Sequence, residues 1–316
     1  MINYIVKRVF SLIPVLFIVS LVIFLLVHIT PGDPAAVILG VDASEEQKIE
    51  LRHQLGLDLP LHEQYISWVV SAVQGDFGDS YFLRQPVTKA IFNHLQPTLS
   101  LAIFAQIITI IIAIPLGIAA AKRRGSIADQ SIMGVSLLGM SIPSFLLGLL
   151  LILLFGVKLG WLPTSGYQGL ETGFWNHLKY LIMPAISLGA IQAALVSRMT
   201  RTSMLEVLGS DYIKTARAKG VKNRVLVYKH ALRNAFLPIL TVIGQTFGVL
   251  VAGAVVTEAI FNIPGIGQLI VNSVERRDYT VIQGVVLFVT LSYVFINLFV
   301  DLLYGLIDPR VRLGDK

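Results

Sequence analysis

The basic residues of this chain gather in one stretch, Arg198–Arg233, which lies between two long apolar runs. Against two acids, Glu206 and Asp211, the stretch holds nine basic residues: Arg198, Arg201, Lys214, Arg217, Lys219, Lys222, Arg224, Lys229 and Arg233. A loop of a membrane protein needs only a few positive charges to fix its orientation. This stretch is longer and is patterned as helix, so it is predicted to be a docking surface.

Residues that could catalyse a reaction lack the spacing that catalytic sites need. The chain has no phosphate-binding loop of the Gly-x-x-x-x-Gly-Lys-Ser/Thr type, no nucleophile elbow and no Ser-x-x-Lys pair. His62-Glu63 is not followed by the second histidine of a zinc protease, and His28 and His94 have no metal-like spacing either. Cysteine is absent, which excludes disulfides and thiolate chemistry. The chain is therefore predicted to be non-catalytic, with no cofactor or metal of its own.

Composition places most of the chain in a membrane. Hydrophobic residues make up 55% and charged residues 14%, and the mean hydropathy is +0.74. A helix needs about 20 apolar residues to cross the hydrocarbon core. Six runs meet this length or approach it: Val9–Ile29, Thr98–Ala121, Ile132–Val157, Tyr180–Val196, Phe236–Ile260 and Val281–Leu306. The predicted fold is an all-α integral membrane protein with six transmembrane helices.

The distribution of charge predicts the orientation of these helices. If the N-terminus is cytoplasmic, as Lys7 and Arg8 indicate, then 17 of the 25 basic residues fall in cytoplasmic segments. Both termini are then cytoplasmic, and topology explains the net charge of +6 without nucleic acid. A cleaved signal peptide is disfavoured, because the first apolar run is long and no small-x-small site follows it.

The segment 31–96, between the first two spans, is predicted to be external and helical. Ser44 and Gln47 form a capping box, and Gly56 is a plausible helix stop. A second helix is expected from Pro60 to Gly75, and a third from Pro86 to Leu95. This segment either packs as a cap on the outer membrane surface or helps to receive a partner or substrate. The sequence leaves both possibilities open.

Polar residues inside the spans are candidates for a translocation path, because such groups are costly in a membrane and often functional. They are Gln106, Gln192, Gln245, Thr246, Glu258 and Asn297. Hydrogen bonding between helices is the alternative role, and it stays open. Gly244 and Gly248 form a small-x-x-x-small pattern, which predicts a close helix contact.

Within the basic stretch, apolar residues recur at helical spacing on both sides of Gly220. Leu205, Leu208, Tyr212 and Ala216 precede it, and Val221, Val225, Tyr228 and Leu232 follow it. The pattern predicts two amphipathic helices that change direction at Gly220. Such helices could also lie on anionic lipid.

The same residues resemble a known loop. Asp211-Tyr-Ile-Lys-Thr-Ala-Arg-Ala-Lys-Gly220, followed by His230-Ala-Leu-Arg-Asn-Ala-Phe-Leu-Pro238, is similar to the Glu-Ala-Ala loop of permease subunits of bacterial ATP-binding-cassette importers. Lys214-Thr215-Ala216 replaces Glu-Ala-Ala and the Gly-to-Pro spacing is longer, as in the dipeptide/oligopeptide/nickel permease family. The resemblance continues in Thr30-Pro-Gly-Asp-Pro34, Leu55-Gly-Leu-Asp-Leu-Pro60, Gly75-Asp-Phe-Gly78, Phe261-Asn-Ile-Pro-Gly-Ile-Gly267 and Asp308-Pro-Arg310. Ser273-Val-Glu-Arg-Arg-Asp-Tyr279 is similar to the glutathione/dipeptide branch.

The resemblance implies a permease in the bacterial inner membrane that imports peptides or glutathione, or alternatively nickel. Its partners would be a second homologous permease, two cytoplasmic ATPases that bind ATP and Mg²⁺, an external solute-binding protein and the lipid bilayer. The implied ATPase-coupling residues are Asp211, Lys214, Thr215, Ala216, Arg217, Ala218, Lys219 and Gly220. The implied organisation is a first helix (1–30), an external segment (31–96), a permease core (97–306) with its coupling loop (198–235), and a cytoplasmic tail (307–316). A stand-alone secondary transporter or channel is the alternative of a different class.

Overall fold

The computed structural model describes residues 2–29, 33–40 and 43–307, and these are almost entirely helical. The first half contains helices α1 (Ile2–Ile29), α2 (Pro34–Leu39), α3 (Glu45–Gln54), α4 (Leu61–Val73), α5 (Val87–Lys122), α6 (Ile127–Ser141) and α7 (Ser144–Leu151). Two antiparallel strands of two residues each, β1 (Asp79–Ser80) and β2 (Gln85–Pro86), form a short hairpin before α5. The second half contains α8 (Phe174–Leu208), α9 (Asp211–Ala218), α10 (Asn223–Val225), α11 (Leu232–Gly253), α12 (Val255–Phe261), α13 (Ile266–Arg276) and α14 (Tyr279–Ile307). Two π-helical turns, η1 (Ile152–Lys158) and η3 (Leu226–Ala231), and a short 3₁₀ turn, η2 (Leu170–Thr172), complete the elements.

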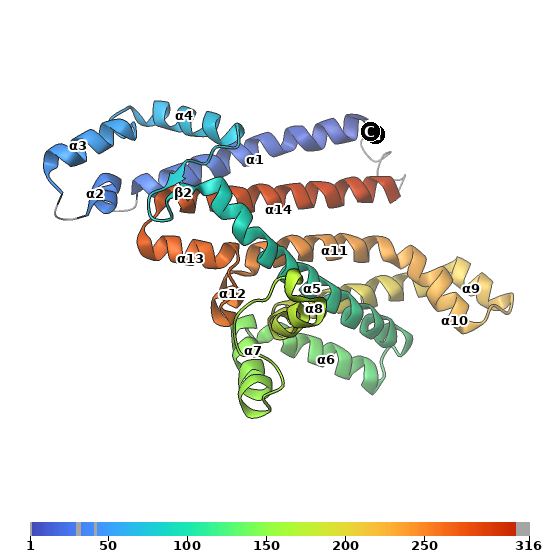
Figure 1. Cartoon of the computed structure of the whole chain (residues 1–316). Helices are drawn as coiled ribbons and strands as arrows, with labels where there is room; N and C mark the ends of the chain where they lie inside the picture. Colours follow the sequence, from blue (N-terminus) through green and yellow to red (C-terminus); the bar gives the residue numbers. More distant parts are fainter. Residues whose placement is uncertain (1, 30–32, 41–42, 308–316) are drawn as a thin grey trace.

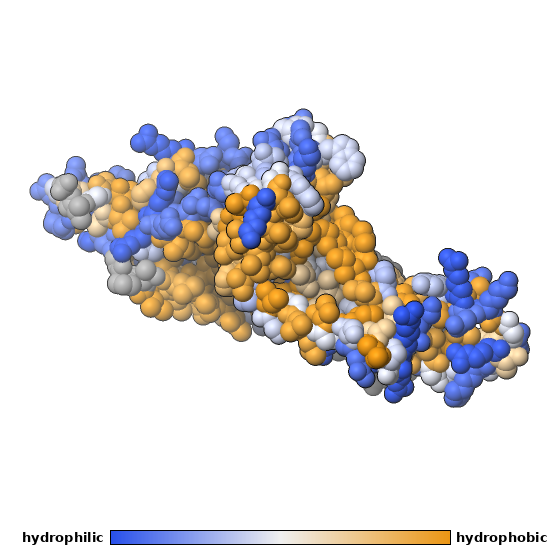
Figure 2. Space-filling view, turned by 90° about the horizontal axis from the view of Figure 1, so that it is seen from below, coloured by the Kyte–Doolittle hydropathy of each residue, from blue (hydrophilic) through white to orange (hydrophobic). Residues whose placement is uncertain are grey.

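The polar elements lie at the two ends of an elongated helical body. Helices α2, α3 and α4 are at one end, and α9 and α10 are at the other (Figure 1). Helix α5 packs along α8, α11 packs against α8 and α14, and α1 lies beside α14. Hydrophilic residues gather at both ends, and hydrophobic residues cover most of the face between them (Figure 2). This distribution is that of a membrane protein with a polar cap at each end.

The apolar helices confirm an all-α membrane architecture. Five helices are long and apolar enough to cross a membrane, and two bent pairs raise the candidate spans to seven among the described residues. The expected fourth span, Tyr180–Val196, forms part of the 35-residue α8. The predicted helix Pro86–Leu95 is not separate, because α5 continues from it through Pro97 into the second span.

The third span is not the straight helix expected over Ile132–Val157. Helices α6 and α7 meet at an angle of 97° at Ile142-Pro143. The ring of a proline disfavours the helical conformation of the residue before it, and Ile142 is accordingly extended (φ −87°, ψ 119°). The prediction of one continuous helix therefore failed at a proline that the sequence displays.

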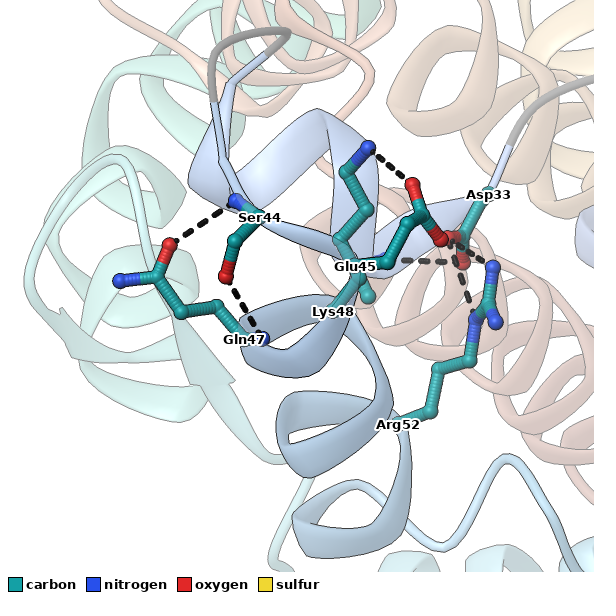
Figure 3. A network of polar contacts seen from close by, with 7 residues as sticks. Asp33, Ser44, Glu45, Gln47, Lys48 and Arg52 are labelled. Carbon is teal, nitrogen blue, oxygen red and sulfur yellow. Dashed lines mark hydrogen bonds and ion pairs between the residues drawn. The ribbon is translucent and has the colours of Figure 1, made fainter.

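The described part of the segment 31–96 has the first two helices that the sequence predicted, but not a separate third one. The Ser44–Gln47 capping box is present, with the Gln47 N–H donating to Ser44 Oγ and the Ser44 N–H to Gln47 Oε1 (Figure 3). Arg52 of α3 pairs with Asp33 before α2, at 2.6 Å between Nη2 and Oδ2. The Arg52 side-chain hydrogen bond is the main reason that the pKa of the Asp33 carboxyl is lowered. The pair ties α2 to α3.

Three buried apolar clusters hold the body together. The first joins α5, α8, α9, η3 and α11 near the end that carries α9. The second joins α5, α8, α11 and α12 in the middle, and the third joins α5, α13 and α14 at the opposite end. Helix α9 is thus anchored in the first cluster, although it stands at the edge of the molecule.

Candidate coupling site and translocation path

Helix α9 is a short helix held by one apolar anchor. Ile213 is fully buried in the first cluster, while its neighbours Tyr212 and Lys214 are exposed. Asp211 occupies the first turn and Arg217 the last, which matches the sign of the helix dipole at each end. The Asn234 Nδ2 also donates to the Tyr212 hydroxyl over 2.6 Å, which links α9 to α11. These contacts fix the position of α9 against the body.

The C-terminus of α9 confirms the turn predicted at Gly220. Gly220 has a φ of +78°, a conformation that favours glycine. Its N–H donates to the Arg217 carbonyl (3.0 Å), and the Val221 N–H donates to the Ala216 carbonyl (3.2 Å). These two bonds make a Schellman motif, and Val221 packs against the same apolar cluster as Ala216. The turn therefore gives α9 a defined exit direction.

The lengths of the two predicted amphipathic helices were wrong. Leu205 and Leu208 belong to the last turns of α8, and Gly209-Ser210 separates them from α9. The residues after Lys222 form no separate surface helix, because α10, η3 and α11 run on as one helix from Asn223 to Gly253. The spacing of apolar residues cannot reveal such breaks, because the residues on both sides of each break bury the same apolar face.

The residues predicted for coupling mostly form an exposed surface. Asp211, Lys214, Thr215, Arg217, Ala218, Lys219 and Gly220 are exposed, and Ala216 is half-buried against the apolar cluster. Among the residues that the structure describes, Lys214 forms an ion pair only with Asp211, at 2.8 Å on the same helix. The exposed face is therefore a positively charged, rigid projection. Its exposed side chains do not anchor α9 to the rest of the protein.

An ion pair between α6 and α8 was not predicted. Asp129, in the first turn of α6, accepts hydrogen bonds from Arg201 Nε (2.6 Å) and Nη2 (2.7 Å) and from the Gly125 N–H (2.9 Å). The Asp129 side chain is only 4% exposed, and that of Arg201 is 25% exposed. The pair fastens the start of α6 to α8 close to the point where α8 leads into α9. Ser126 and Asp129 have the Ser-x-x-Asp spacing of a helix start, which was the available sequence signal.

Replacing Arg201 by alanine should destabilise the protein more than replacing Asp129. The first change leaves a buried carboxylate with one N–H partner, whereas the second leaves a guanidinium that can turn to water. We expect Arg201→Ala to cost about 2 kcal/mol of unfolding free energy. Thermal unfolding in detergent should show a Tm loss on the order of 5 °C. Arg198→Ala is the matched control, because exposed Arg198 contacts only Met140 Sδ at 3.7 Å. Equal losses for Arg201→Ala and Arg198→Ala would contradict the role of the pair.

The six candidate path residues do not share one environment. Thr246 Oγ1 donates to Gln106 Oε1 over 3.3 Å, and both residues are buried where α11 meets α5. Gln245, next to Thr246, is exposed on the other side of α11. Gln192 on α8 and Asn297 on α14 are half-buried, and Asn297 Nδ2 donates to the Tyr293 carbonyl. The structure thus brings Gln106 and Thr246 together and leaves Gln192, Gln245 and Asn297 apart.

The close helix contact predicted at Gly244 and Gly248 is confirmed. A side chain at Gly244 would collide with Val300 of α14, and one at Gly248 would lie 3.0 Å from the Tyr293 ring. The two glycines therefore allow α11 to approach α14.

Glu258 lies fully buried in the elbow between α12 and α13, which meet at 86°. Its Oε1 accepts from Thr98 Oγ1 (2.6 Å), and its Oε2 accepts from the N–H groups of Gly267 (2.7 Å) and Gln268 (3.2 Å). The N-cap of α13 is Gly265, which has no side chain, so the carboxylate takes the place of a capping side chain. A side chain at Gly265 or Gly267 would collide with Glu258.

Comparisons with known proteins identify the family. A model of the binding-protein-dependent transport system inner membrane component matches residues 113–313, and a model of the N-terminal part of such components matches residues 1–102. The chain belongs to this family. The binding-protein-dependent permease is thus an integral component of an ATP-binding-cassette importer in the inner membrane, and the resemblance found in the sequence is confirmed. It acts with an ATPase and a solute-binding protein.

Individual relatives of this permease cover its whole length. The glutathione transport system permease protein GsiC of Escherichia coli K12 is 48% identical over 99% of both chains, and that of Shigella flexneri serotype 5b is 47% identical over the same share. Two crystal forms of the inward-facing MetNI methionine ABC transporter have TM-scores of 0.57 and 0.58, with 20% and 19% identity, and cover 69% of this chain and 96% of that chain. At that identity the structures show a shared fold.

Proposed function

We propose that this permease imports short peptides, glutathione among them, and that α9 is the element through which the ATPase drives it. The substrate proposal is supported by the relatives at 48% identity, whose names state glutathione transport. The coupling proposal rests on one observation. Helix α9 is anchored by buried Ile213, yet the helix and the turn that follows it present seven of the eight predicted coupling residues to the outside.

The mechanism follows from the stiffness of this attachment. The Schellman turn and the buried anchor leave α9 little freedom to move apart from α8 and the helix that begins at Asn223. Closure of an ATPase around α9 would therefore tilt these long helices as rigid bodies. ATP and Mg²⁺ would be bound by two ATPase subunits, and a second homologous permease would complete the membrane part. The solute-binding protein would deliver the substrate from outside.

The proposed topology has six membrane crossings and cytoplasmic termini. It is supported by the position of α9 at the end opposite the external helices (Figure 1). The bent pair α6–α7 would count as the third crossing, and α12–α13 would return to the outer surface after the fifth. Trp161 and Trp175, which are 68% and 72% exposed, have the placement of aromatic residues at a membrane interface.

For the path we propose Gln192, Gln245 and Asn297, because they are the candidates that retain exposed surface. Gln106, Thr246 and Glu258 are buried and hydrogen-bonded between helices. We assign these three to packing inside this subunit.

Cysteine labelling tests both the topology and the docking surface, because the chain contains no native cysteine. Ala218→Cys should react with a membrane-impermeant maleimide in inverted vesicles only, and bound ATPase should prevent the reaction. Glu50→Cys, on exposed α3, is the matched control and should react only in right-side-out vesicles, with or without ATPase. Labelling of Ala218→Cys from outside would refute the topology. Labelling that bound ATPase does not reduce would refute the docking.

The substrate class is tested by uptake into cells that contain the complete importer. Radiolabelled glutathione and a labelled dipeptide should accumulate, and labelled nickel should not. Accumulation of nickel alone would refute the peptide proposal.

A further inference from the structure

A cavity of about 320 Å³ lies beneath the external helices, at the end opposite α9. Its walls come from the end of α1, from α4, from residues 76–82 and from the start of α14. Aromatic rings line much of it, among them Phe24, Trp68, Phe77, Tyr81 and Tyr279. Its volume is at the lower end of the range of small-molecule sites, so a ligand of two or three amino-acid residues fits the scale.

The walls of the cavity are held in place by contacts of their own. Helix α4 is fixed to α1 by a hydrogen bond of 2.8 Å between the Tyr65 and Ser20 hydroxyls and by the packing of Phe24 against Tyr65. The other wall is fixed by the bond from Ser80 Oγ to Asp278 and by the close approach of Gly78 to Thr280. The cavity is therefore preformed and does not depend on a bound ligand.

Arg277, an exposed residue, lines this cavity and has an unusual backbone conformation. Its φ of +56° lies in the left-handed region, where it ends α13 in a Schellman motif with the Asp278 N–H donating to the Ser273 carbonyl. Glycine is the favoured residue at such a position. An arginine here costs some backbone stability relative to glycine.

The guanidinium of Arg277 is also unpaired. In the part of the chain that the structure describes, it has neither an ion pair nor a hydrogen bond. The carboxylate of the next residue, Asp278, accepts hydrogen bonds from the Ser80 hydroxyl and the Val281 N–H. Asp76, which also lines the cavity, accepts a hydrogen bond from the Gly78 N–H. The cavity therefore offers a free cation, a carboxylate and aromatic walls.

We propose that this cavity is a binding site on the permease for a short peptide, whose C-terminal carboxylate pairs with Arg277. An apolar side chain of the peptide would lie among the rings, and Asp76 would face its ammonium group. A guanidinium binds a carboxylate through two parallel hydrogen bonds, which makes it the suitable group for this task. The proposal rests on the proposed function and adds a recognition site outside the helices that line the path.

The test uses the complete importer in nanodiscs without its solute-binding protein. Binding of labelled glycylphenylalanine is measured by equilibrium dialysis and compared with that of its C-terminal amide. Arg277→Gly should weaken binding of the acid at least about ten-fold. Its Tm should stay equal or rise, because glycine suits the left-handed conformation. The amide should bind the unmodified protein as weakly as the acid binds the variant.

Arg84→Gly is the matched control. Arg84 is also an arginine at positive φ (+51°) in the external segment, and it does not line the cavity. This variant should bind the peptide like the unmodified protein. If Arg277→Gly lowers the Tm, Arg277→Asn, which tolerates the same conformation, replaces it in the test.

Three results separate the possible errors. Equal binding of the peptide acid and its amide, or unchanged peptide binding by Arg277→Gly, would contradict the proposed binding site. Uptake that continues in cells while nanodisc binding is absent would overturn the site and leave the proposed function standing. Binding that behaves as expected while cells take up no peptide would uphold the site and contradict the proposed function.

Discussion

Ala218→Asp should abolish substrate uptake while the permease still inserts into the membrane. Ala218 is exposed at the end of α9 between Arg217 and Lys219, so within the fold the change costs the helix propensity of aspartate, at most about 0.7 kcal/mol, and an unfavourable interaction with the helix dipole of about 0.3–1 kcal/mol. In a protein cleft the new carboxylate would lose its water without a partner, which costs several times more. Uptake of labelled substrate should fall to background, and the ATPase should no longer co-purify.

Three further variants show whether the loss comes from docking. Ala218→Ser adds a small neutral group and should retain uptake and ATPase co-purification. Gly220→Val should lose both, since a β-branched residue cannot hold a φ of +78°, whereas Gly220→Asn should retain the turn. Uptake that survives both Ala218→Asp and Gly220→Val would show that α9 is not the coupling element.

Glu258→Ala should cause the largest loss of stability of any change considered. The side chain is fully buried, and its removal leaves the N–H groups of Gly267 and Gln268 without their acceptor. Each unsatisfied buried donor costs about 1–3 kcal/mol, so we expect a loss of about 3 kcal/mol or more. The measurement is thermal unfolding in detergent, with the amount of membrane-inserted protein as a second readout.

Glu275→Ala provides the control on the same helix pair. Glu275 is exposed on α13, and its replacement should change stability by less than about 0.5 kcal/mol. Glu258→Gln should recover only part of the loss, because the amide offers one acceptor oxygen where the carboxylate offers two. If Glu258→Ala melts like Glu275→Ala, the carboxylate does not hold the elbow.

Local rules predicted the parts of the fold that depend on neighbouring residues. The capping box at Ser44 and the left-handed turn at Gly220 were both read from the sequence and are both present. The apolar runs predicted membrane helices because each run is continuous in the sequence. The sequence did not reveal where a helix bends, since Pro143 breaks one helix while Pro97 and Pro184 are accommodated in others. That outcome depends on which neighbours pack around each proline.

The candidate sites were predictable to different degrees. The coupling residues are contiguous, so one helix presents them together. The path residues come from five helices, and only their packing shows that Thr246 is buried while Gln245 is exposed. Asp129 and Arg201 are far apart in sequence and meet only in the folded protein. Arg277 lies in the stretch Ser273–Tyr279 that resembles the family, but the sequence did not single it out as a binding residue, because its distinguishing property is a backbone angle.

The length of α8 has a mechanical consequence. Its 35 residues span about 52 Å at 1.5 Å per residue, and α9 is attached directly to one end. A helix of that length pivoting about its midpoint by about 10° moves each end by about 4–5 Å, in opposite directions. A displacement of one end of α8 therefore produces an equal displacement of the other end in the opposite direction. If the ATPase moves α9 as proposed, this geometry would close one face of the permease as it opens the other.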